Sequence, residues 1–557
     1  MSRILVIGGY GGFGARLARR LLASGHEVLV AGRSMAKAAA FCEAHAGATP
    51  LVADRNSGIG LVMARERPDL VIDAAGPFQG SGTTVPEACI AMRIPYLDLA
   101  DARGFVTGIG ALDRMAKAAG VPAISGASSV PALSGAVSRR LAAGLDAVER
   151  VEMAISASNR ASAGESVAAA ILSYVGRPVR LWRGKRWDVA HGWQAMRREA
   201  FQLGDGSGLG GRLTGIADVP DLDIAPAMLP GRPSVVFRAG TELGLQMRAL
   251  WLASWPVRWG WMASLEPARR WLMPLYRTML RLGGDRSAMH VTLVGRAGGR
   301  DVERRWTLVA RNGDGPEIPT LAAQLLAEAI LAGRVAPGAR HGWGELELEA
   351  FEPLFAGLAI RHETVERELS PPLYARVLGD AFDALPPAVR AVHDFVADGG
   401  ATGEGSVARG SKLLARLLAA AMRMPPAGHY PLEVSFEGCA EGERWTRRFG
   451  PYRFLSVLSG RAGQVIERFG PLRFHFDLPA DREGLRMVSR GWSAFGIPMP
   501  RGLGPRIAAR EWQEGERFRF DVAVAMPLIG PVVAYAGWLA PSPGGAAAQR
   551  SQRAMAG

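Results

Sequence analysis

Three glycines near the start of the chain have the spacing of a dinucleotide-binding turn. Gly9, Gly11 and Gly14 form a G-x-G-x-x-G motif directly after the apolar residues 4–7. One glycine permits the tight turn, the second lets the backbone approach a pyrophosphate, and the third lets a helix pack closely on the strand. Because the motif follows an apolar run and opens a helical pattern, it predicts a functional dinucleotide site. The expected contacts are Gly9, Tyr10, Gly11, Gly12, Phe13 and Gly14.

The end of the second expected strand, residues 26–34, indicates which dinucleotide binds. An NAD site usually has an acidic residue there, about 20 residues after the glycines, which binds the ribose 2′-hydroxyl. This chain has Arg33 and Ser34 instead, and Lys37 follows. A guanidinium and a hydroxyl suit a 2′-phosphate, which a carboxylate would repel. We therefore predict NADP as the cofactor; the alternative is that Arg33 is an ordinary surface arginine.

Four further apolar runs complete a parallel sheet. They lie at residues 51–54, 69–75, 94–101 and 121–126, and helix-length segments separate them. Six strands alternating with helices predict an α/β fold, a Rossmann-type doubly wound parallel sheet over residues 1–140. Ligands bind outside the carboxyl ends of such strands. We expect Asp54 near the adenine, and Ala75, Gly76, Pro77 and Phe78 over the middle or nicotinamide half of the cofactor.

The fifth expected strand supplies the candidate proton donors. Asp98 and Asp101 leave this strand at the edge where the cofactor is expected, and Tyr96 precedes them. We favour Asp101, with Asp98 and Tyr96 as the other catalytic candidates. The alternatives are that Asp101 caps the helix that follows and that Tyr96 is buried. None of the eight tyrosines has a lysine four residues later, so the Tyr/Lys proton transfer of short-chain dehydrogenases is not expected.

Several of these motifs occur together in one known family. The phrases G-G-Y-G-G-F-G, A-G-R-S, A-A-G-P-F-Q, Y-L-D-L-A-D and G-A-S-S-V-P follow one another in this order. Across residues 1–350 the chain resembles the saccharopine dehydrogenase-like NADP-binding oxidoreductases. The resemblance implies the fold, the cofactor NADP and oxidoreductase activity. It implies little about the substrate, because the family includes lysine-pathway reductases, lipid-associated oxidoreductases and enoyl reductases of polyketide lipid synthesis.

Residues 141–350 are expected to form an α+β substrate and dimerisation domain. Alternating and helical patterns predict strands at 150–162, 235–238, 289–294 and 302–310, a helix at 164–174, and a helix at 320–332 that folds back onto the cofactor domain. The segment 245–282 holds five of the fourteen tryptophans, and Arg270, Arg277 and Arg281 share one helical face. Such a segment is typical of an interfacial membrane helix. A buried helix with snorkelling arginines is the alternative.

Residues 371–540 resemble an uncharacterised bacterial domain often fused behind such oxidoreductases, through the phrases L-P-P-A-V-R-A-V-H, E-R-W-T-R-R-F and I-E-R-F-G-P-L. Helices are expected at 386–396 and 412–422, and strands dominate from residue 432 onward. The pattern predicts a C-terminal, mostly antiparallel β domain, a curved sheet or barrel that could enclose an apolar ligand. Its candidate polar contacts are His393, Trp445, Arg447 and Glu467, whose alternative role is as ordinary sheet-face residues.

The end of the chain raises the question of a membrane span. Residues 522–540 lack charge over a length that could span a membrane. Pro527, Gly530 and Pro531 interrupt the stretch, however, and favour a hairpin around that turn. Residues 541–557 are rich in Ser, Gly, Ala and Gln, and we expect them to form a disordered tail.

Composition narrows the partners and the compartment. The net charge is +14, yet no long Lys/Arg block or nucleic-acid-binding signature occurs, so we expect no nucleic acid. An anionic membrane surface or an acidic substrate suits this charge better. Three scattered cysteines and nine histidines show no metal-ligand spacing, so we expect no metal site. Reduced cysteines favour a cytoplasmic location, with membrane association through 245–282 left open.

The sequence is compatible with two functions. The first is an NADP(H)-dependent oxidoreductase that reduces a bulky lipid- or polyketide-like small molecule, as a monomer or a homodimer. The second is a non-catalytic NADP-binding scaffold or sensor whose C-terminal domain binds a ligand or partner. The lack of an identifiable acid/base pair favours the second, whereas Arg33 and the Trp/Arg segment favour the first.

Overall fold

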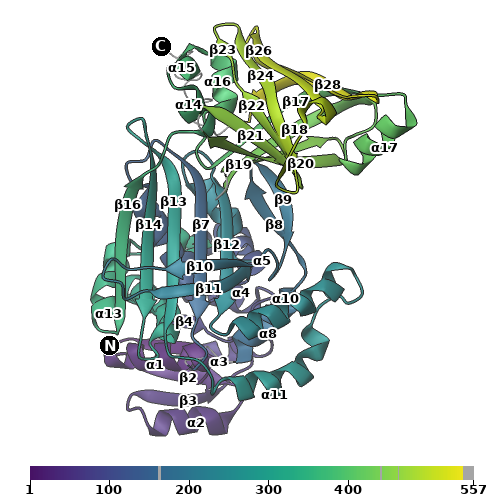
Figure 1. Ribbon diagram of the computed structural model, residues 1–557. Helices are drawn as coiled ribbons and strands as arrows, with labels where there is room; N and C mark the ends of the chain where they lie inside the picture. Colours follow the sequence, from purple (N-terminus) through teal and green to yellow (C-terminus); the bar gives the residue numbers. More distant parts are fainter. Residues whose placement is uncertain (161–164, 440–441, 462, 543–557) are drawn as a thin grey trace.

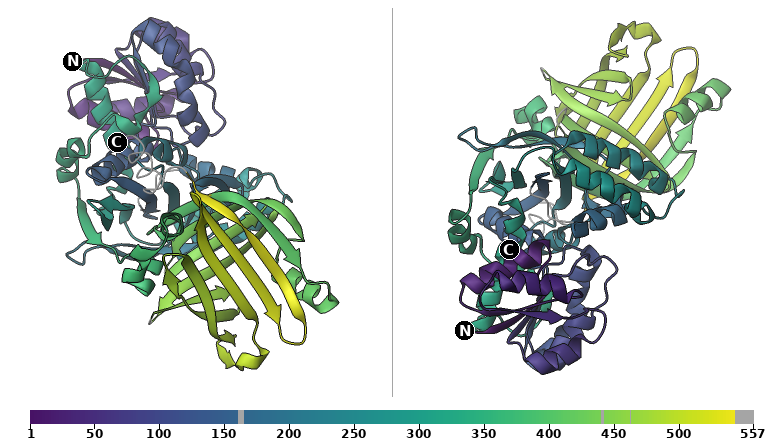
Figure 2. Two further views of the ribbon diagram at one scale, coloured as in Figure 1. Left: turned by 90° about the horizontal axis from the view of Figure 1, so that it is seen from above. Right: turned by 90° about the horizontal axis from the view of Figure 1, so that it is seen from below.

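The computed structural model describes residues 1–160, 165–439, 442–461 and 463–542. Within these residues three large sheets follow one another along the molecule (Figure 1). The first and third sheets lie at opposite ends in both views of Figure 2, with the second between them. The expected strand at 150–162 and helix at 164–174 fall partly outside the described residues, and the expected tail falls almost wholly outside them.

The first sheet confirms the predicted Rossmann fold. Seven parallel strands have the order β15-β6-β5-β4-β1-β2-β3, in which the first six strands of the chain form the doubly wound pattern. The seventh strand, β15 (Gly338–His341), was not expected. The other elements are β1 (Arg3–Ile7), α1 (Gly12–Ala23), β2 (Glu27–Gly32), α2 (Met35–Glu43), β3 (Ala48–Val52), α3 (Ile59–Glu66), β4 (Leu70–Asp73), α4 (Thr84–Ala91), β5 (Tyr96–Asp98), α5 (Arg103–Gly108), α6 (Asp113–Ala119), β6 (Pro122–Ser125) and α7 (Ser134–Ala142).

The helix expected to fold back does so. It is α12 (Ile318–Leu331), whose buried face packs against α1. Glu317, directly before α12, forms ion pairs with Arg20 at 2.9 Å and Arg16 at 3.2 Å on α1. The chain therefore returns to the first sheet before it adds β15 to that sheet's edge.

The second sheet is mixed, with the order β10-β11-β12-β7-β13-β14-β16. Only β12 and β7 are parallel. Strands β13 and β14 confirm the strands expected at 289–294 and 302–310, and they pair antiparallel. The elements of this part of the chain are β7 (Ala147–Ala157), α8 (Glu165–Tyr174), β8 (Pro178–Arg183), β9 (Arg186–His191), β10 (Arg197–Phe201), β11 (Leu209–Ile216), α9 (Asp221–Met228), β12 (Ser234–Thr241), α10 (Gly244–Arg258), α11 (Arg269–Met279), β13 (Ser287–Ala297), β14 (Arg300–Ala310), α13 (Glu352–Ala356) and β16 (Ile360–Glu368). Strands β8 and β9 pair with each other in a separate two-stranded antiparallel sheet.

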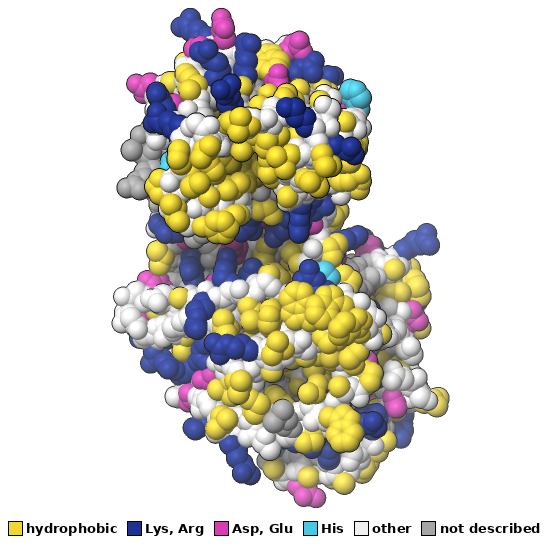
Figure 3. Space-filling view, turned by 45° about the vertical axis from the view of Figure 1, so that its right-hand side comes forward, with side chains coloured by type: hydrophobic (Ala, Val, Ile, Leu, Met, Phe, Trp, Pro, Cys, Tyr) yellow, Lys and Arg dark blue, Asp and Glu magenta, His cyan; other side chains and the backbone are white. Residues whose placement is uncertain are grey.

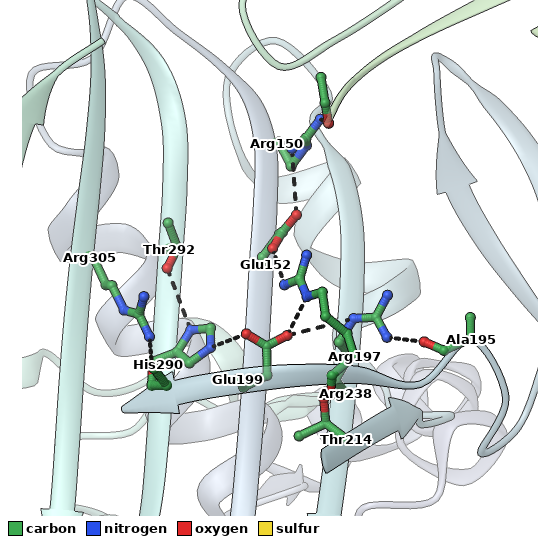
Figure 4. A network of polar contacts seen from close by, with 12 residues as sticks. Arg150, Glu152, Ala195, Arg197, Glu199, Thr214, Arg238, His290, Thr292 and Arg305 are labelled. Atoms are coloured by element: carbon green, nitrogen blue, oxygen red, sulfur yellow. Dashed lines mark hydrogen bonds and ion pairs between the residues drawn. The ribbon is translucent and has the colours of Figure 1, made fainter. Parts of the chain in front are cut away.

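A buried charge network holds β10 across the face of this sheet (Figure 4). Glu199 of β10 lies at its centre, where Arg197 donates to its carboxylate at 2.6 Å and His290 of β13 lies 3.5 Å away. Arg197 also pairs with Glu152 of β7 at 2.5 Å. Burial would raise the pKa of Glu199, but hydrogen bonds from His290 and Arg197 prevail and lower it to about 2. The network therefore favours the ionised carboxylate.

This network predicts a pH-dependent loss of stability. Because the folded pKa of Glu199 is depressed, its contribution is present above the unfolded value near 4.3 and is lost as the pH falls through about 2. The shift corresponds to about 3 kcal/mol. Urea unfolding between pH 5 and pH 2 should therefore show a steeper loss for the wild-type chain than for Glu199→Gln. Parallel curves for the two proteins would contradict this role of Glu199.

The third sheet is a closed barrel. Ten strands follow one another in chain order as an antiparallel meander, and β17 pairs with β28 to close it. The prediction of a C-terminal antiparallel β structure is confirmed, in its barrel form. Its elements are α14 (Leu373–Leu378), α15 (Asp380–Ala384), α16 (Pro387–His393), β17 (Asp398–Arg409), α17 (Leu413–Ala421), β18 (Gly428–Cys439), β19 (Gly442–Phe449), β20 (Tyr452–Arg461), β21 (Gln464–Phe469), β22 (Leu472–Asp477), β23 (Ala480–Asp481), β24 (Gly484–Ala494), β25 (Ile497–Met499), β26 (Arg506–Glu514), β27 (Arg517–Met526) and β28 (Gly530–Pro541).

The uncharged stretch at 522–540 is a hairpin, as predicted. Strands β27 and β28 pair along their length around the turn that contains Pro527 and Leu528. Among the described residues, no helix combines the length and the apolar character that crossing a membrane requires.

Candidate functional site

The glycine turn forms an anion-binding loop at the end of β1. The Gly8 amide donates to Ala31 on β2 at 2.7 Å, and the Gly11 amide donates back to Gly8 at 2.8 Å. Helix α1 begins at Gly12 with no acidic residue in its first turn and no side chain capping its amides. The first N–H groups of the helix therefore remain available to a negatively charged group, as a pyrophosphate site requires.

The space around the turn explains why these positions are glycines. A Cβ atom on Gly14 would lie 2.1 Å from the Gly8 carbonyl oxygen, and one on Gly9 would lie 2.9 Å from the Val6 oxygen. Neither position admits a side chain without movement of the backbone. Helix α1 can approach β1 this closely only with Gly14 in place, so the turn fits a dinucleotide.

Gly14→Ala should therefore damage the site. The added methyl group must push α1 away from Gly8, and overpacking of this kind costs about 1–3 kcal/mol. We expect NADPH affinity to fall by about tenfold or more and the thermal midpoint to drop by several degrees. Gly60→Ala is the matched control, because a Cβ atom on that helical glycine meets no atom within 4 Å. Equal NADPH affinity in both variants would show that the close approach is not needed.

The turn after β2 presents the residues expected to bind a 2′-phosphate. Arg33 is exposed, and no hydrogen bond or ion pair joins it to another described residue. The Ser34 amide donates to the Tyr10 hydroxyl at 3.0 Å, and the Ser34 hydroxyl accepts from the Lys37 amide at 3.4 Å. Tyr10 also covers Gly32, whose Cβ would lie 2.4 Å from the Tyr10 hydroxyl. Tyr10 thus positions the turn that carries Arg33, a role the sequence did not indicate.

Arg55 organises the loop after β4, and sequence reasoning missed it. Its guanidinium pairs with the buried Asp73 at 2.9 Å and donates to the Ala75 carbonyl at 3.1 Å. The same group lies 4.6 Å from the centre of the Phe78 ring. Residues 75–78 are therefore tied to the end of β3. Asp54, expected near the adenine, accepts the Asn56 amide at 2.9 Å in a local turn, so its contact with adenine stays a prediction.

Two of the three catalytic candidates lie inside the protein. Tyr96 and Asp98 have no exposed surface. One Asp98 oxygen accepts from the Ala100 amide at 2.9 Å, the Gly126 amide at 2.8 Å and the Ser125 hydroxyl at 3.0 Å. Burial outweighs these bonds and raises the pKa of Asp98 to about 6. This placement suits a carboxylate that joins β5 to β6.

Asp101 lies at the carboxyl edge of the sheet, three residues after the end of β5. Its side chain is exposed to solvent, although the protein around its carboxyl raises its pKa. Gln79, directly after the 75–78 loop, donates to it at 3.4 Å. Tyr174, at the end of α8, is close enough that the Asp101 charge adds to burial in raising the pKa of the Tyr174 hydroxyl. No sequence pattern pointed to Gln79 or Tyr174.

A second set of contacts fixes the second sheet over this edge. Arg103, two residues after Asp101, pairs with Asp223 at 2.5 Å and with Asp218 at 2.9 Å. Asp223 lies on α9, so α5 and α9 are held together beside Asp101. Helices that accompany the first and the second sheet therefore meet where the nicotinamide end of a dinucleotide is expected.

The barrel interior encloses little space. A cavity of about 60 Å³ is lined by Trp445, Arg447 and Glu467, three of the four predicted polar contacts. The fourth, His393, lies beneath it and contacts Glu511 at 2.7 Å. Ligand pockets measure about 300 Å³ or more, so this cavity does not accommodate the apolar ligand that the pattern suggested.

The cofactor sheet, its glycine turn and the polar groups at its carboxyl edge define an NAD(P)-dependent oxidoreductase. Residues 4–124 match the family model of the saccharopine dehydrogenase NADP binding domain, so the cofactor is NADP. Residues 385–539 match the domain of unknown function DUF4166. The chain thus joins a saccharopine dehydrogenase-type NADP-binding domain to a C-terminal domain of unknown function.

Solved structures show distant similarity. Apo saccharopine dehydrogenase (L-Glu forming) from Saccharomyces cerevisiae is 12% identical, with a TM-score of 0.47 over 66% of this chain and 100% of that one. An amine dehydrogenase from Mycobacterium smegmatis is 13% identical, with a TM-score of 0.33 over 61% of this chain and 95% of that one. No curated protein sequence matches this chain.

Proposed function

We propose that this enzyme uses NADPH to reduce a bulky, lipid- or polyketide-like small molecule. The observation that carries the proposal is an exposed tryptophan surface on the helices that adjoin the site. Trp259, Trp261 and Trp271 are 56%, 73% and 71% exposed, and the indole rings of Trp255, Trp259 and Trp261 follow one another at 5.4 and 4.8 Å. Large exposed apolar patches mark places where apolar ligands, membranes or partners bind.

This surface is joined to the helix that carries Tyr174. Leu172 and Val175, at the end of α8, share a small buried cluster with Met247 and Val257 of α10. The outer side of α10 and α11 therefore backs directly onto the elements beside Asp101. An apolar substrate that meets the tryptophan surface would have a short path to the site.

The charge of the same segment suits a membrane surface. Residues 245–282 contain six arginines and one acidic residue, Glu266. Tryptophan side chains beside arginines are typical of helices that lie in the headgroup region. We propose that this segment touches an anionic membrane from one side and so presents the enzyme to lipid substrates.

In the proposed reduction, the cofactor and the side chains at the carboxyl edge of the first sheet have separate roles. NADPH supplies the hydride when it is bound. Asp101, whose pKa is raised, keeps its proton to a higher pH than an ordinary carboxyl group does and can donate it to the reduced substrate. Gln79 orients the Asp101 carboxyl through its amide, and the Tyr174 hydroxyl is near enough for the Asp101 charge to raise its pKa. A Tyr/Lys pair is not needed in this arrangement.

A substrate series tests the proposal. NADPH consumption should be followed with enoyl, carbonyl and imine compounds, each as a short-chain and a long-chain analogue in detergent. We expect turnover for one of these groups and a higher kcat/KM for the long-chain analogue. Tight NADPH binding without turnover on any compound would instead favour the scaffold or sensor.

A further inference from the structure

The two ends of the barrel differ in how they are covered. Helices α14, α15 and α16 lie against one end, where His393 and Tyr374 are buried. The opposite end carries α17 and the turns at 450–451, 470–471, 495–505 and 527–529. We call this second end, defined by α17 and these turns, the α17 end.

Exposed apolar side chains gather at the α17 end. Leu413 is 72% exposed, Phe495 83% and Leu528 98%. Further exposed side chains there are Leu414, Leu417, Tyr452, Ile497 and Leu503. Among the described residues of α14, α15 and α16, by contrast, no large apolar side chain is exposed. The barrel therefore presents apolar groups to solvent at one end in particular.

The two ends also differ in charge. The segments 409–428, 449–453, 469–472, 494–506 and 526–531, which make up the α17 end, contain seven lysines or arginines and no aspartate or glutamate. The covered end carries both signs of charge: Asp380, Asp383 and Asp481 lie there with Arg376, Arg390 and Arg482. Exposed leucines among cations, without any carboxylate, complement a surface that is apolar beneath and negatively charged at its face.

A groove adds to the positive character of this end. Its volume is about 1040 Å³, and it runs along the barrel wall from the turns near Pro505, Pro527 and Pro531. Its described lining includes five arginines and a single acidic residue, Asp521. Arginine side chains of this kind bind phosphate oxygens through paired N–H groups. The groove therefore suits phospholipid headgroups beside the exposed leucines.

The α17 end faces the same way as the tryptophan surface. Figure 1 places α17 and the α10–α11 pair along one side of the molecule. Figure 3 brings that side forward and shows apolar side chains gathered both on the barrel and on the part of the molecule next to it, with Lys and Arg side chains beside them. Ion pairs between the second sheet and the barrel region hold the two parts in this orientation, among them Arg150 with Asp398 at 2.7 Å and Arg296 with Asp394 at 2.6 Å.

We propose that the α17 end is a second membrane-docking surface, which binds an anionic phospholipid bilayer together with the α10–α11 segment. The inference rests on the membrane contact proposed above for residues 245–282. A bilayer is extended enough to meet two separate apolar patches on one side of the molecule. A second copy of this chain would bring the same cations against these cations, so charge disfavours it as the occupant.

Vesicle flotation of the full-length chain tests the inference. The variant Leu413→Ser/Leu414→Ser/Leu417→Ser removes the exposed leucines of α17, and Leu61→Ser/Val189→Ser/Val365→Ser removes three exposed apolar side chains elsewhere. With vesicles of equal parts phosphatidylglycerol and phosphatidylcholine, we expect the α17 variant to bind about tenfold or more weakly than wild type and the control to bind normally. Trp259→Ser/Trp261→Ser should weaken binding as well, and phosphatidylcholine vesicles should bind wild type less.

Normal vesicle binding by the α17 variant would overturn the inference, provided that its thermal unfolding matches that of the control. An absence of vesicle binding by wild type, with a dimer that the α17 variant breaks into monomers, would overturn it in favour of a second copy. The assay needs neither NADPH nor substrate. If the α17 end does not bind membranes, turnover on detergent-solubilised substrate should still be observed. If the proposed reductase activity is wrong, that turnover should be absent while vesicle flotation is unchanged.

Discussion

Replacing Arg33 with aspartate is expected to lower the affinity for NADPH by about a hundredfold or more and to raise the affinity for NADH by a smaller factor. Arg33 is exposed at the end of β2, without a partner among the described residues, beside the Ser34 hydroxyl. Its guanidinium can bind a 2′-phosphate, whereas a carboxylate would repel that phosphate and accept the 2′-hydroxyl of NADH. Fluorescence titration with both cofactors measures the two affinities.

Two further variants make the Arg33 result specific. Arg33→Lys keeps the charge without the paired N–H groups, so NADPH affinity should fall by a smaller factor. Arg114→Asp changes the net charge equally at an exposed position on α6 and should leave both affinities unchanged. If Arg33→Asp leaves the ratio of the two affinities as it was, the assignment of Arg33 to the 2′-phosphate is wrong.

Replacing Asp101 with asparagine is expected to lower kcat by about 10²–10⁴-fold without changing the affinity for NADPH. The carboxyl can donate a proton, and the amide that replaces it cannot. Because the surrounding protein raises the pKa of Asp101, wild-type kcat should fall as the pH rises through that raised value. The asparagine variant should lack this limb of the pH profile, which a merely structural role would not remove.

The controls for Asp101 separate chemistry from folding. Asp380→Asn changes an exposed carboxyl on α15 and should leave kcat and the pH profile as they are. Tyr174→Phe tests whether the neighbouring hydroxyl is the donor instead. An unchanged kcat in Asp101→Asn, together with a large loss in Tyr174→Phe, would transfer the role to Tyr174.

The cofactor sheet could be predicted from the sequence because its signals are local. The apolar runs and the glycine spacing lie within a few residues of the contacts they make. Strand β15 escaped notice because Gly-Ala-Arg-His has no apolar run, and its partner β6 lies about two hundred residues earlier in the chain. Its place depends on α12 first packing on α1. No local sequence pattern could indicate this long-range packing.

The sequence predicted an antiparallel barrel or curved sheet, but three of its strands were not predicted. Strand β17 was missed because its glycines gave it the composition of a loop. In the barrel a Cβ atom on Gly403 would lie 1.9 Å from the Trp538 oxygen, so that glycine lets β28 approach closely enough to close the sheet. Strand β24 exposes Val488, and strand β26 places Glu511 among the residues that line the barrel interior, so neither strand alternates cleanly between apolar and polar residues in the sequence.

Only those residues of the site that belong to one local sequence motif could be predicted. The contacts of Arg55 and Tyr174 join segments far apart in the chain, so neither side chain differed from an ordinary arginine or tyrosine in the sequence. The carboxylates of β5 were identified together, but only the structure separates the buried Asp98 from the exposed Asp101.

The proposed transfer of hydride from NADPH to a lipid-like molecule can be followed with an isotope. NADPH that carries deuterium at the transferable position is incubated with the full chain and a bacterial lipid extract in detergent, and the lipids are analysed by mass spectrometry. We expect deuterium in a lipid product in proportion to the NADP⁺ formed, and none with Asp101→Asn. Saturable NADPH binding with no deuterium in any lipid would show that this enzyme does not reduce a lipid.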